Sequence, residues 1–474
     1  MADAHYDLVV IGGGPTGIGG ANAAGFFGKR VALVEMAPEI GGAGLNTGTI
    51  PSKALRESAL VIAGWHTRKL LGVDLTLKRE TRLGDFMYHS VHVTAAVRVV
   101  LQSRMQTAGV ELLRGVGSFA DPHTIRVVDD AGRETLVSGS SILIASGSSP
   151  RRPAEFPFDH PRVHDSSQLL EITELPRSLA VVGAGVIGAE YACTFAALGA
   201  EVHVIDGRES LLPFLDHEIS AGITAAMQRH GIQFHWRERV VACSAPEQGD
   251  VVLQLGSNRT LAVSDVLVAA GRTSNTDALN LAAAGLTPAK RGLLRVNATY
   301  QTDVPHIYAA GDVIGAPALL ATGMEQARVA VCHAFDLLDK QMTSLLPTGI
   351  YTIPEASMVG ETEAAVRESG VPYLVGRAPY STNTRGRLIG DEDGFLKLIF
   401  RRDDMRLLGV HVLGEQATEL VHIGATAMLC DADAALFNRA CFNFPTLGDL
   451  YKYAAYDAIL QRRGLKVSLP DSAR

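Results

Sequence analysis

Cysteine is scarce in this chain, and its few copies are scattered. The 474 residues include five cysteines, and no two of them lie close together: Cys193, Cys243, Cys332, Cys430 and Cys441. An odd number without close spacing argues against a disulfide framework and against a cysteine zinc site, so we expect no bound metal. We expect reduced, buried thiols, which are typical of a cytoplasmic protein, and we predict that location.

Long runs of positive charge and plausible membrane spans are also missing. The formal net charge is −7, and no basic stretch offers the patch that a nucleic-acid partner requires. The beginning of the chain has no charged segment followed by an apolar one, so no signal peptide is predicted. Residues 179–200 are apolar enough to imitate a membrane helix. Their glycines and Glu190 instead indicate a buried strand, a turn and a buried helix.

Glycines follow an apolar run near the N-terminus in a spacing typical of dinucleotide-binding folds. A strand predicted over 8–11 is followed by Gly12, Gly14 and Gly17. The three glycines permit, in that order, a tight turn, close approach of the backbone to a pyrophosphate, and packing of the next helix on the strand. Glu35 ends the next predicted strand, 18 residues after Gly17, where an acid can bind ribose hydroxyls.

A second complete unit repeats this pattern inside the chain. Gly183, Gly185 and Gly188 follow another apolar run, and Asp206 lies 18 residues after the last of them. Two full units predict two nucleotide cofactors, one held tightly and one exchanging. Asp206 suits the ribose hydroxyls of NAD and repels a 2′-phosphate, which favours NAD(H). Arg208 either pairs with a 2′-phosphate or is an ordinary solvated loop arginine.

Small residues end three further predicted strands. Gly311 and Asp312 follow a strand in the stretch 304–310. The Asp312 carboxylate either accepts hydrogen bonds from a polyhydroxy chain, or caps a helix N-terminus, or does both. Gly147 and Gly271 lie in a matched pair of segments, 141–150 and 265–275, which we expect to mark crossings between two nested domains.

These motifs together resemble the pyridine nucleotide–disulfide oxidoreductases, a family of class I flavoproteins. The resemblance covers nearly the whole chain and includes both glycine units, GTIPSKAL at 48–55, ASGSSP at 145–150, AAGRTSNT at 269–276 and YAAGDVIG at 308–315. It implies an α/β fold with two nested Rossmann-like domains and a C-terminal α+β dimerisation domain. FAD would be bound by residues 1–155 and 272–345, NAD(H) or NADP(H) by 156–271, and a homodimer would form through 346–474.

The resemblance also assigns site residues to each cofactor. The FAD residues are Gly12, Gly14, Gly17, Glu35, Lys53, Gly147, Gly311 and Asp312. The NAD(P) residues are Gly183, Gly185, Gly188, Glu190, Asp206, Arg208 and Gly271. For the dimerisation domain, the residues themselves predict only adjacent strands at 395–400 and 407–414 and a buried helix at 419–430.

The residues that carry disulfide chemistry in this family are missing. The two redox cysteines correspond to Gly44 and Thr49, the acid–base histidine to Phe444, and the glutamate after it to Asp449. Glycine has no side chain, and a threonine hydroxyl forms no stable anion near neutral pH. We therefore reject disulfide reduction. Phe444 is expected to belong to the interface core, the alternative being that it stacks on an aromatic acceptor.

The residues for flavin–nicotinamide chemistry are retained. By the resemblance, Lys53 lies beside flavin N5 and pairs with Glu190, so these two are the expected catalytic residues. A cation there favours the reduced flavin, and a carboxylate holds the lysine in place. Taken singly, Lys53 reads as a solvated surface lysine and Glu190 as one half of a helix salt bridge. Their positions in two matched motifs favour the catalytic role.

Three functions are compatible with this pattern. The first is an FAD-dependent NAD(P)H oxidoreductase without a redox disulfide, a transhydrogenase that passes hydride between nicotinamide nucleotides. The second is an NAD(P)H dehydrogenase, or diaphorase, that reduces a quinone, oxygen or another small-molecule acceptor, using room left by Gly44. The third is a non-enzymatic binding subunit, against which the intact glycine units and the Lys53 and Glu190 pair argue.

Overall fold

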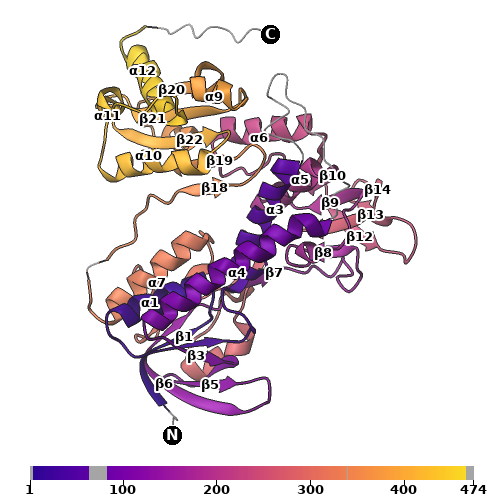
Figure 1. Cartoon of the computed structure of the whole chain (residues 1–474), viewed down its shortest axis with the longest axis vertical. Helices are drawn as coiled ribbons and strands as arrows, with labels where there is room; N and C mark the ends of the chain where they lie inside the picture. Colours follow the sequence, from indigo (N-terminus) through magenta and orange to yellow (C-terminus); the bar gives the residue numbers. More distant parts are fainter. Residues whose placement is uncertain (1–3, 63–82, 339, 466–474) are drawn as a thin grey trace.

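The N-terminal strands and the C-terminal helices lie at opposite ends of the long axis of the molecule (Figure 1). The computed structural model describes residues 4–62, 83–338 and 340–465. Within these ranges the strands form three larger sheets and two smaller ones. The α/β class predicted from the sequence is confirmed by these sheets and the helices that cover them.

The first large sheet is built around the first glycine unit. Its strands take the order β3-β2-β1-β6-β5-β4, with β17 paired to β6. The parallel members are β1 (Ala4–Ile11), β2 (Val31–Glu35), β3 (Glu111–Arg114), β6 (Glu134–Ile144) and β17 (Ile307–Ala309), and β5 (Thr124–Val128) and β4 (Val116–Asp121) follow in antiparallel pairing. The second half of β1 is buried throughout, as a parallel strand covered on both faces requires.

Five helices belong to this region or border it. They are α1 (Pro15–Phe26), α2 (Gly42–Asn46), α3 (Thr49–Ile62), α4 (Leu83–Thr107) and α7 (Leu320–Ala334). Helices α1 and α7 pack against each other although they are about 300 residues apart, and α3 packs against both α4 and α5 of the second region. Helix α3 therefore links the first region to the second.

The second large sheet surrounds the second glycine unit. Its five strands are all parallel, in the order β11-β10-β9-β15-β8. They are β8 (Val163–Asp165), β9 (Ser178–Val182), β10 (Glu201–Asp206), β11 (Gln233–Trp236) and β15 (Asp265–Val268). Helices α5 (Val186–Ala197) and α6 (His217–Arg229) accompany the sheet. The buried strand, turn and helix predicted for 179–200 are thus confirmed.

A smaller antiparallel sheet extends the second region. It consists of β12 (Val240–Ser244), β13 (Val251–Leu255) and β14 (Thr260–Val263). Two short strands, β7 (Ser148–Pro150) and β16 (Arg272–Ser274), pair with each other where the chain passes between the first and second regions. They lie within the matched segments, directly after Gly147 and Gly271.

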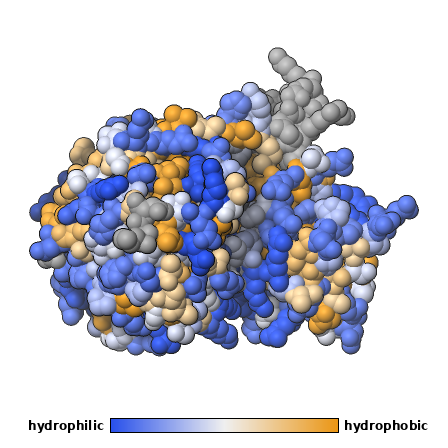
Figure 2. Space-filling view, turned by 90° about the horizontal axis from the view of Figure 1, so that it is seen from below, coloured by the Kyte–Doolittle hydropathy of each residue, from blue (hydrophilic) through white to orange (hydrophobic). Residues whose placement is uncertain are grey.

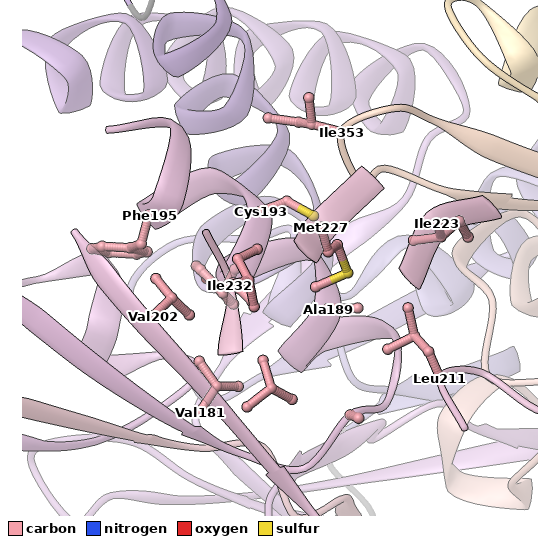
Figure 3. Close-up of a cluster of buried hydrophobic side chains, with 14 of the residues drawn as sticks. Val181, Ala189, Cys193, Phe195, Val202, Leu211, Ile223, Met227, Ile232 and Ile353 are labelled. Atoms are coloured by element: carbon pink, nitrogen blue, oxygen red, sulfur yellow. The ribbon is translucent and has the colours of Figure 1, made fainter. Parts of the chain in front are cut away.

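The hydrophobic core of the second region includes residues from the first region and from the C-terminal region, which contains β18 (Thr348–Ile350). Figure 3 shows part of this cluster, with labels on Val181, Ala189, Cys193, Phe195, Val202, Leu211, Ile223, Met227, Ile232 and Ile353. Most of these side chains come from β9, β10, α5 and α6. Ile353 comes from the C-terminal region, and Leu55 of α3 belongs to the same cluster. The three regions therefore share apolar contacts that fix their relative positions.

The third large sheet is antiparallel and forms the C-terminal region. Its order is β18-β19-β22-β21-β20, for β18 (Thr348–Ile350), β19 (Ala356–Gly360), β20 (Tyr373–Pro379), β21 (Phe395–Arg401) and β22 (Leu407–Leu413). The helices are α8 (Glu363–Glu368), α9 (Thr384–Leu388), α10 (Ala417–Leu429), α11 (Ala434–Arg439) and α12 (Leu450–Arg462). The adjacent strands at 395–400 and 407–414 and the helix near 419–430 were predicted, and all three are confirmed.

The surface mixes polar and apolar side chains. On the face in Figure 2, hydrophilic and hydrophobic residues are interspersed over both lobes. Among the described helices, none combines the length and the apolar character needed to cross a bilayer.

Candidate active site

The first glycine unit forms a turn that only glycine can make. Gly12 has φ +109°, and a Cβ added to it would lie 2.4 Å from the Ala145 carbonyl oxygen. A Cβ added to Gly17 would lie 1.9 Å from the Gly12 carbonyl oxygen. The turn is therefore tight, and α1 is packed as closely on β1 as its backbone allows.

The second glycine unit repeats this geometry closely. Gly183 has φ +113°, and its added Cβ would lie 2.5 Å from the Ala269 carbonyl oxygen. An added Cβ on Gly188 would lie 1.9 Å from the Gly183 carbonyl oxygen, as for Gly17 and Gly12. An added Cβ on Gly185 would meet no described atom within 4 Å. The two units are structural copies of one another.

In each unit, the acid at the end of the second strand accepts a hydrogen bond from a backbone N–H of the glycine turn. Glu35 is buried, and its Oε2 accepts a hydrogen bond from the Gly13 N–H at 2.7 Å. Asp206 Oδ2 accepts in the same way from the Ala184 N–H at 2.6 Å. The N-cap residues of α1 and α5 are Gly14 and Gly185, and neither helix has a side-chain cap.

These features fit two bound dinucleotides. The uncapped N–H groups at the start of α1 and α5 are free of side-chain competition and carry the positive end of the helix dipole, which suits a pyrophosphate. The acid beside each turn suits ribose hydroxyls. The first copy is the candidate FAD site and the second is the candidate nicotinamide nucleotide site.

Two hydrogen bonds join the side chains of Asp206 and Arg208. Arg208 donates from Nε to Oδ1 at 2.9 Å and from Nη2 to Oδ2 at 2.7 Å, and its backbone N–H donates to Oδ1 at 2.8 Å. Burial opposes ionisation of Asp206, but the bonds from Arg208 and from the Ala184 N–H outweigh it and lower the pKa of the carboxyl. Arg208 is thus held by the acid beside it, and its side chain is still 45% exposed, so part of the guanidinium stays accessible to a ligand.

Asp312 does not cap a helix. Strand β17 ends at Ala309, and residues Gly311–Ile314 form a short 3₁₀ turn whose N-cap residue is Ala310. The Asp312 carboxylate instead accepts from the Ser148 hydroxyl at 2.6 Å and lies 3.7 Å from Arg272 Nε. The capping alternative is therefore wrong. The carboxylate is still about one-third exposed and has room to accept from a ligand.

The remaining predicted glycines also have left-handed backbones. Gly147 has φ +69°, Gly271 has φ +97° and Gly311 has φ +78°. Side chains added at Gly147 and Gly271 would meet no described atom within 4 Å, whereas a Cβ on Gly311 would lie 2.6 Å from Thr16 Oγ1. Gly311 therefore packs directly against the first turn of α1, which brings Asp312 to the candidate FAD site.

Lys53 and Glu190 meet although they come from different regions. Lys53 is in the first half of α3 and Glu190 is in α5, and Lys53 Nζ lies 2.6 Å from Glu190 Oε2. The lysine side chain is about one-quarter exposed and the glutamate side chain about one-tenth. The contact between α3 and α5 therefore produces the pair that the sequence predicts.

A third residue, Tyr351, contacts both members of this pair and was not predicted from the sequence. The Tyr351 N–H donates to Glu190 Oε1 at 2.9 Å, and Lys53 Nζ lies 5.0 Å from the centre of the Tyr351 ring. One residue further along, the Thr352 carbonyl accepts from Arg56 of α3. The signal available in the sequence was an aromatic residue in GIYTIP, which directly follows β18 in the structure.

Gly44 does not open a pocket. A Cβ added to it would lie 2.9 Å from Leu320 Cδ1 and 2.9 Å from Pro15 Cγ. The space of the missing side chain is therefore filled by α7 and by the start of α1, which contradicts the expectation of room there. Thr49 is the first residue of α3, and its carbonyl accepts from the Ser52 hydroxyl.

The other positions of the lost disulfide chemistry lie in the C-terminal region. Phe444 is 69% exposed in the single chain, and Asp449 ends a short 3₁₀ turn before α12. All five cysteines are within the described residues, and all are free. Only Cys193 and Cys332 are buried, so the prediction of buried thiols is wrong for the other three. Cys193 lies one turn after Glu190, but burial raises the pKa of its thiol to about 12, so it is no replacement for a redox thiol.

Within the described ranges no group of three or more histidine, cysteine or acidic side chains could hold a metal ion.

Comparisons with known proteins agree with this geometry. The family model "Pyridine nucleotide-disulphide oxidoreductase" matches residues 6–334, and the dimerisation domain of the same family matches residues 346–455. A protein of Mycobacterium bovis named soluble pyridine nucleotide transhydrogenase is 44% identical over 462 residues, covering 97% of this chain and 98% of that protein. A protein of the same name from a Marinomonas species is 38% identical, covering 96% and 98%.

Solved structures show the same architecture. LpdA from Mycobacterium tuberculosis superposes with a TM-score of 0.88 at 25% identity, covering 95% of this chain and 99% of that chain. The flavoprotein disulfide reductase RclA from Escherichia coli superposes with a TM-score of 0.85 at 26% identity, covering 94% and 99%. The family uses FAD and NAD(P)H. With both of its models matched and both nucleotide units in place, this chain belongs to the pyridine nucleotide-disulphide oxidoreductase family and is a flavin-dependent oxidoreductase of pyridine nucleotides.

Proposed function

We propose that this chain is an FAD-dependent transhydrogenase that passes hydride from one nicotinamide nucleotide to another. The observation that carries the proposal is a complete Lys53 and Glu190 pair in a chain that has Gly44 and Thr49 at the positions of the family's redox cysteines. The names of the relatives at 38–44% identity over nearly the full length support the same activity.

The proposed roles of the residues follow from their chemistry. FAD, when bound, supplies a ring that accepts hydride and releases it again. The Lys53 ammonium stabilises negative charge that develops beside it, and Glu190 keeps the ammonium in one place at 2.6 Å. Gly12, Gly14, Gly17, Glu35, Gly147, Gly311 and Asp312 would hold FAD, while Gly183, Gly185, Gly188, Asp206, Arg208 and Gly271 would hold the exchanging nucleotide. No further acid–base group is needed, because hydride transfer between two nicotinamides moves no separate proton.

The pairing of Asp206 with Arg208 favours use of both nucleotides. The ribose hydroxyls of NAD(H) donate to a carboxylate, and Asp206 supplies one. A 2′-phosphate is repelled by a bare carboxylate, but Arg208 partly neutralises this one at 2.7 Å and can donate to the phosphate. A transhydrogenase has to accept both nucleotides, and this pair offers each of them a partner.

Anaerobic mixing tests the proposed activity. Protein purified with its flavin is reduced by NADPH, separated from excess nucleotide and mixed with thio-NAD. We expect flavin reduction, then reoxidation with the appearance of reduced thio-NAD in equal amount. Reduction that is never followed by reduced thio-NAD, under conditions in which another acceptor does reoxidise the flavin, would remove the transhydrogenase proposal.

The alternative is an NAD(P)H dehydrogenase that reduces a quinone, oxygen or another small molecule. It depended on space beside the flavin at Gly44, and Leu320 and Pro15 fill that space. We therefore rank it second. In the same anaerobic mixing experiment, the reduced protein is also mixed with a soluble quinone. Reoxidation of the flavin by the quinone and not by thio-NAD would favour the dehydrogenase.

We also propose a homodimer and a cytoplasmic location. The dimerisation model matches residues 346–455, and that region exposes large apolar side chains: Leu429, Phe444 and Tyr453 are 61%, 69% and 54% exposed. The five unpaired cysteines suit a reducing compartment. Sedimentation velocity tests the first point and localisation of the tagged protein in cells tests the second.

A further inference from the structure

Tyr351 connects the C-terminal region to the Lys53 and Glu190 pair. It follows β18 directly and lies between two residues of the shared apolar core, Ile350 and Ile353, which are 0% and 2% exposed. Arg56 of α3 donates from Nη2 to the Thr352 carbonyl at 3.1 Å. The backbone on both sides of Tyr351 is therefore fixed against α3 and the core of the second region.

The backbone of Tyr351 holds the glutamate. Its N–H donates to Glu190 Oε1 at 2.9 Å, while Lys53 binds the other carboxylate oxygen, Oε2, at 2.6 Å. With one partner on each oxygen, the carboxylate cannot rotate without losing a charge-assisted hydrogen bond. The plane of Glu190 is thus set by the C-terminal region and not by α5 alone.

The ring of Tyr351 lies under the lysine. Lys53 Nζ is 5.0 Å from the ring centre, within the range in which an aromatic face attracts a cation. Burial raises the pKa of the Tyr351 hydroxyl, so the ring stays neutral and keeps its attractive face.

We propose that Tyr351 is a positioning residue for hydride transfer, which holds the Lys53 ammonium through its ring and the Glu190 carboxylate through its N–H. This inference rests on the proposed function, because it gives Tyr351 its effect through the proposed catalytic pair. The pair is then assembled from three regions: α3, α5 and the segment after β18. Docking of the C-terminal region is part of the assembly of the site.

A graded series of ring substitutions tests the attraction without changing shape. In the holoenzyme, Tyr351 is replaced by phenylalanine and by mono-, di- and trifluorophenylalanine, which weaken the negative face of the ring in steps. The midpoint potential of the bound flavin and the rate of its reduction by NADH are measured for each. We expect both to fall step by step. The whole series should span on the order of 10-fold in stabilisation of the reduced state, which is about 30 mV for a two-electron couple.

Two further variants separate this proposal from the proposed function. Lys53→Met removes the cation, and Tyr351→Leu removes the ring but keeps an apolar side chain and the backbone N–H. If Lys53→Met lowers the potential while the fluorinated series and Tyr351→Leu do not, the positioning role is overturned and the catalytic pair stands. If Lys53→Met changes neither potential nor rate, the role of the pair fails and the positioning role fails with it.

A purely structural role for Tyr351 gives a different result. It predicts lower thermal stability in Tyr351→Leu with potential and rate unchanged, and no trend along the fluorinated series, whose members have nearly the same volume. A trend in potential at constant stability supports the inference. A flat series overturns it.

Discussion

At the scale of single residues, Arg208 is where we expect nucleotide choice to be decided. Arg208→Ala removes a guanidinium that can bind a 2′-phosphate and leaves the Asp206 carboxylate without its partner. A charge-assisted hydrogen bond contributes about 2 kcal/mol, so kcat/KM for NADPH should fall roughly 30-fold. The value for NADH should not fall, because Asp206 is released to bind ribose. Steady-state kinetics with each nucleotide measure both.

A matched control for this change lies in the first region, outside the second glycine unit. Arg133 and Asp129 form a comparable pair at 2.7 Å on the turn between β5 and β6. Arg133→Ala should leave both kcat/KM values unchanged. An equal loss for NADH and NADPH in Arg208→Ala would contradict a role in recognising the phosphate.

Gly44 is the second residue for which the structure predicts the effect of a replacement, here on the free energy of unfolding. Gly44→Cys puts a Cβ 2.9 Å from both Leu320 and Pro15, and crowding of this kind costs about 1–3 kcal/mol of the free energy of unfolding. Combining it with Leu320→Ala should cost less than the sum of the two single changes, because the removed leucine atoms make room. Urea unfolding of the three variants measures the coupling.

Gly256→Cys is the control for that experiment. Its added Cβ would lie 3.8 Å from the nearest described atom, so the same substitution there meets no crowding. A Gly44→Cys variant as stable as the Gly256→Cys variant would show that α7 yields easily, and the filled space would then be no barrier to an acceptor.

At the scale of elements, a buried lysine joins the second region to the C-terminal one. Lys397 of β21 is 1% exposed and donates to Asp216 at 2.9 Å, Glu218 at 2.7 Å and Glu363 at 2.7 Å. Asp216 also caps α6 by accepting from the Glu218 N–H. Arg377 of β20 is the second cation of this group and donates to Glu218 at 2.6 Å. The cluster therefore ties the start of α6 to the antiparallel sheet.

Lys397→Met should weaken this joint strongly. It leaves a buried carboxylate, Asp216, without its cation, and breaking a buried pair costs about 3–5 kcal/mol. The free energy of unfolding from urea titration measures the loss. Arg229→Met is the control, since its pair with Asp393 joins the same two regions but is more than half exposed on both sides, and such pairs contribute less than about 1 kcal/mol.

The same cluster predicts sensitivity to acid. Hydrogen bonding from Arg377 and Lys397 lowers the pKa of Glu218 from 4.5 to about 2, and contacts with Lys397 lower the pKa of Asp216 despite its burial. Carboxyls with a lowered folded-state pKa stabilise the fold above their unfolded pKa and lose that contribution as the pH falls. Stability should therefore drop between about pH 4.5 and pH 2. The drop should be shallower in Lys397→Met, as measured by unfolding at several pH values, and an equal slope in both proteins would contradict this origin.

At the scale of the whole molecule, the exposed aromatic residues of the C-terminal region should lie between two copies of the chain. Phe444→Glu places a charge at a side chain that is 69% exposed in the single chain, and a buried unpaired charge at an interface is unfavourable. We expect dissociation at a higher protein concentration than for the parent, seen by sedimentation velocity. Phe26→Glu, at the 62% exposed end of α1, is the control and should sediment like the parent.

Local patterns were sufficient to predict several elements of this fold. The glycine spacing and the apolar runs around it located β1, α1, β9 and α5, because close helix packing and buried parallel strands impose rules that act within about 30 residues. The adjacent strands β21 and β22 were found in the same way. The ion pairs of Lys397, in the middle of β21, could not be predicted from the sequence. Its three acidic partners are 34, 179 and 181 residues away along the chain.

In the candidate site, too, some features follow from the sequence and others only from the tertiary structure. By itself the sequence determined which residues are present: two nucleotide units with an acid at the end of each, a lysine and a glutamate in matching motifs, and no thiol at Gly44 or Thr49. Only the tertiary structure decided how they meet. It put Tyr351 against Lys53 and Glu190, paired Arg208 with Asp206, and filled the space at Gly44 with Leu320. The reason is physical: backbone turns follow from local sterics, whereas the partner of a charge and the contents of a space depend on which distant elements pack there.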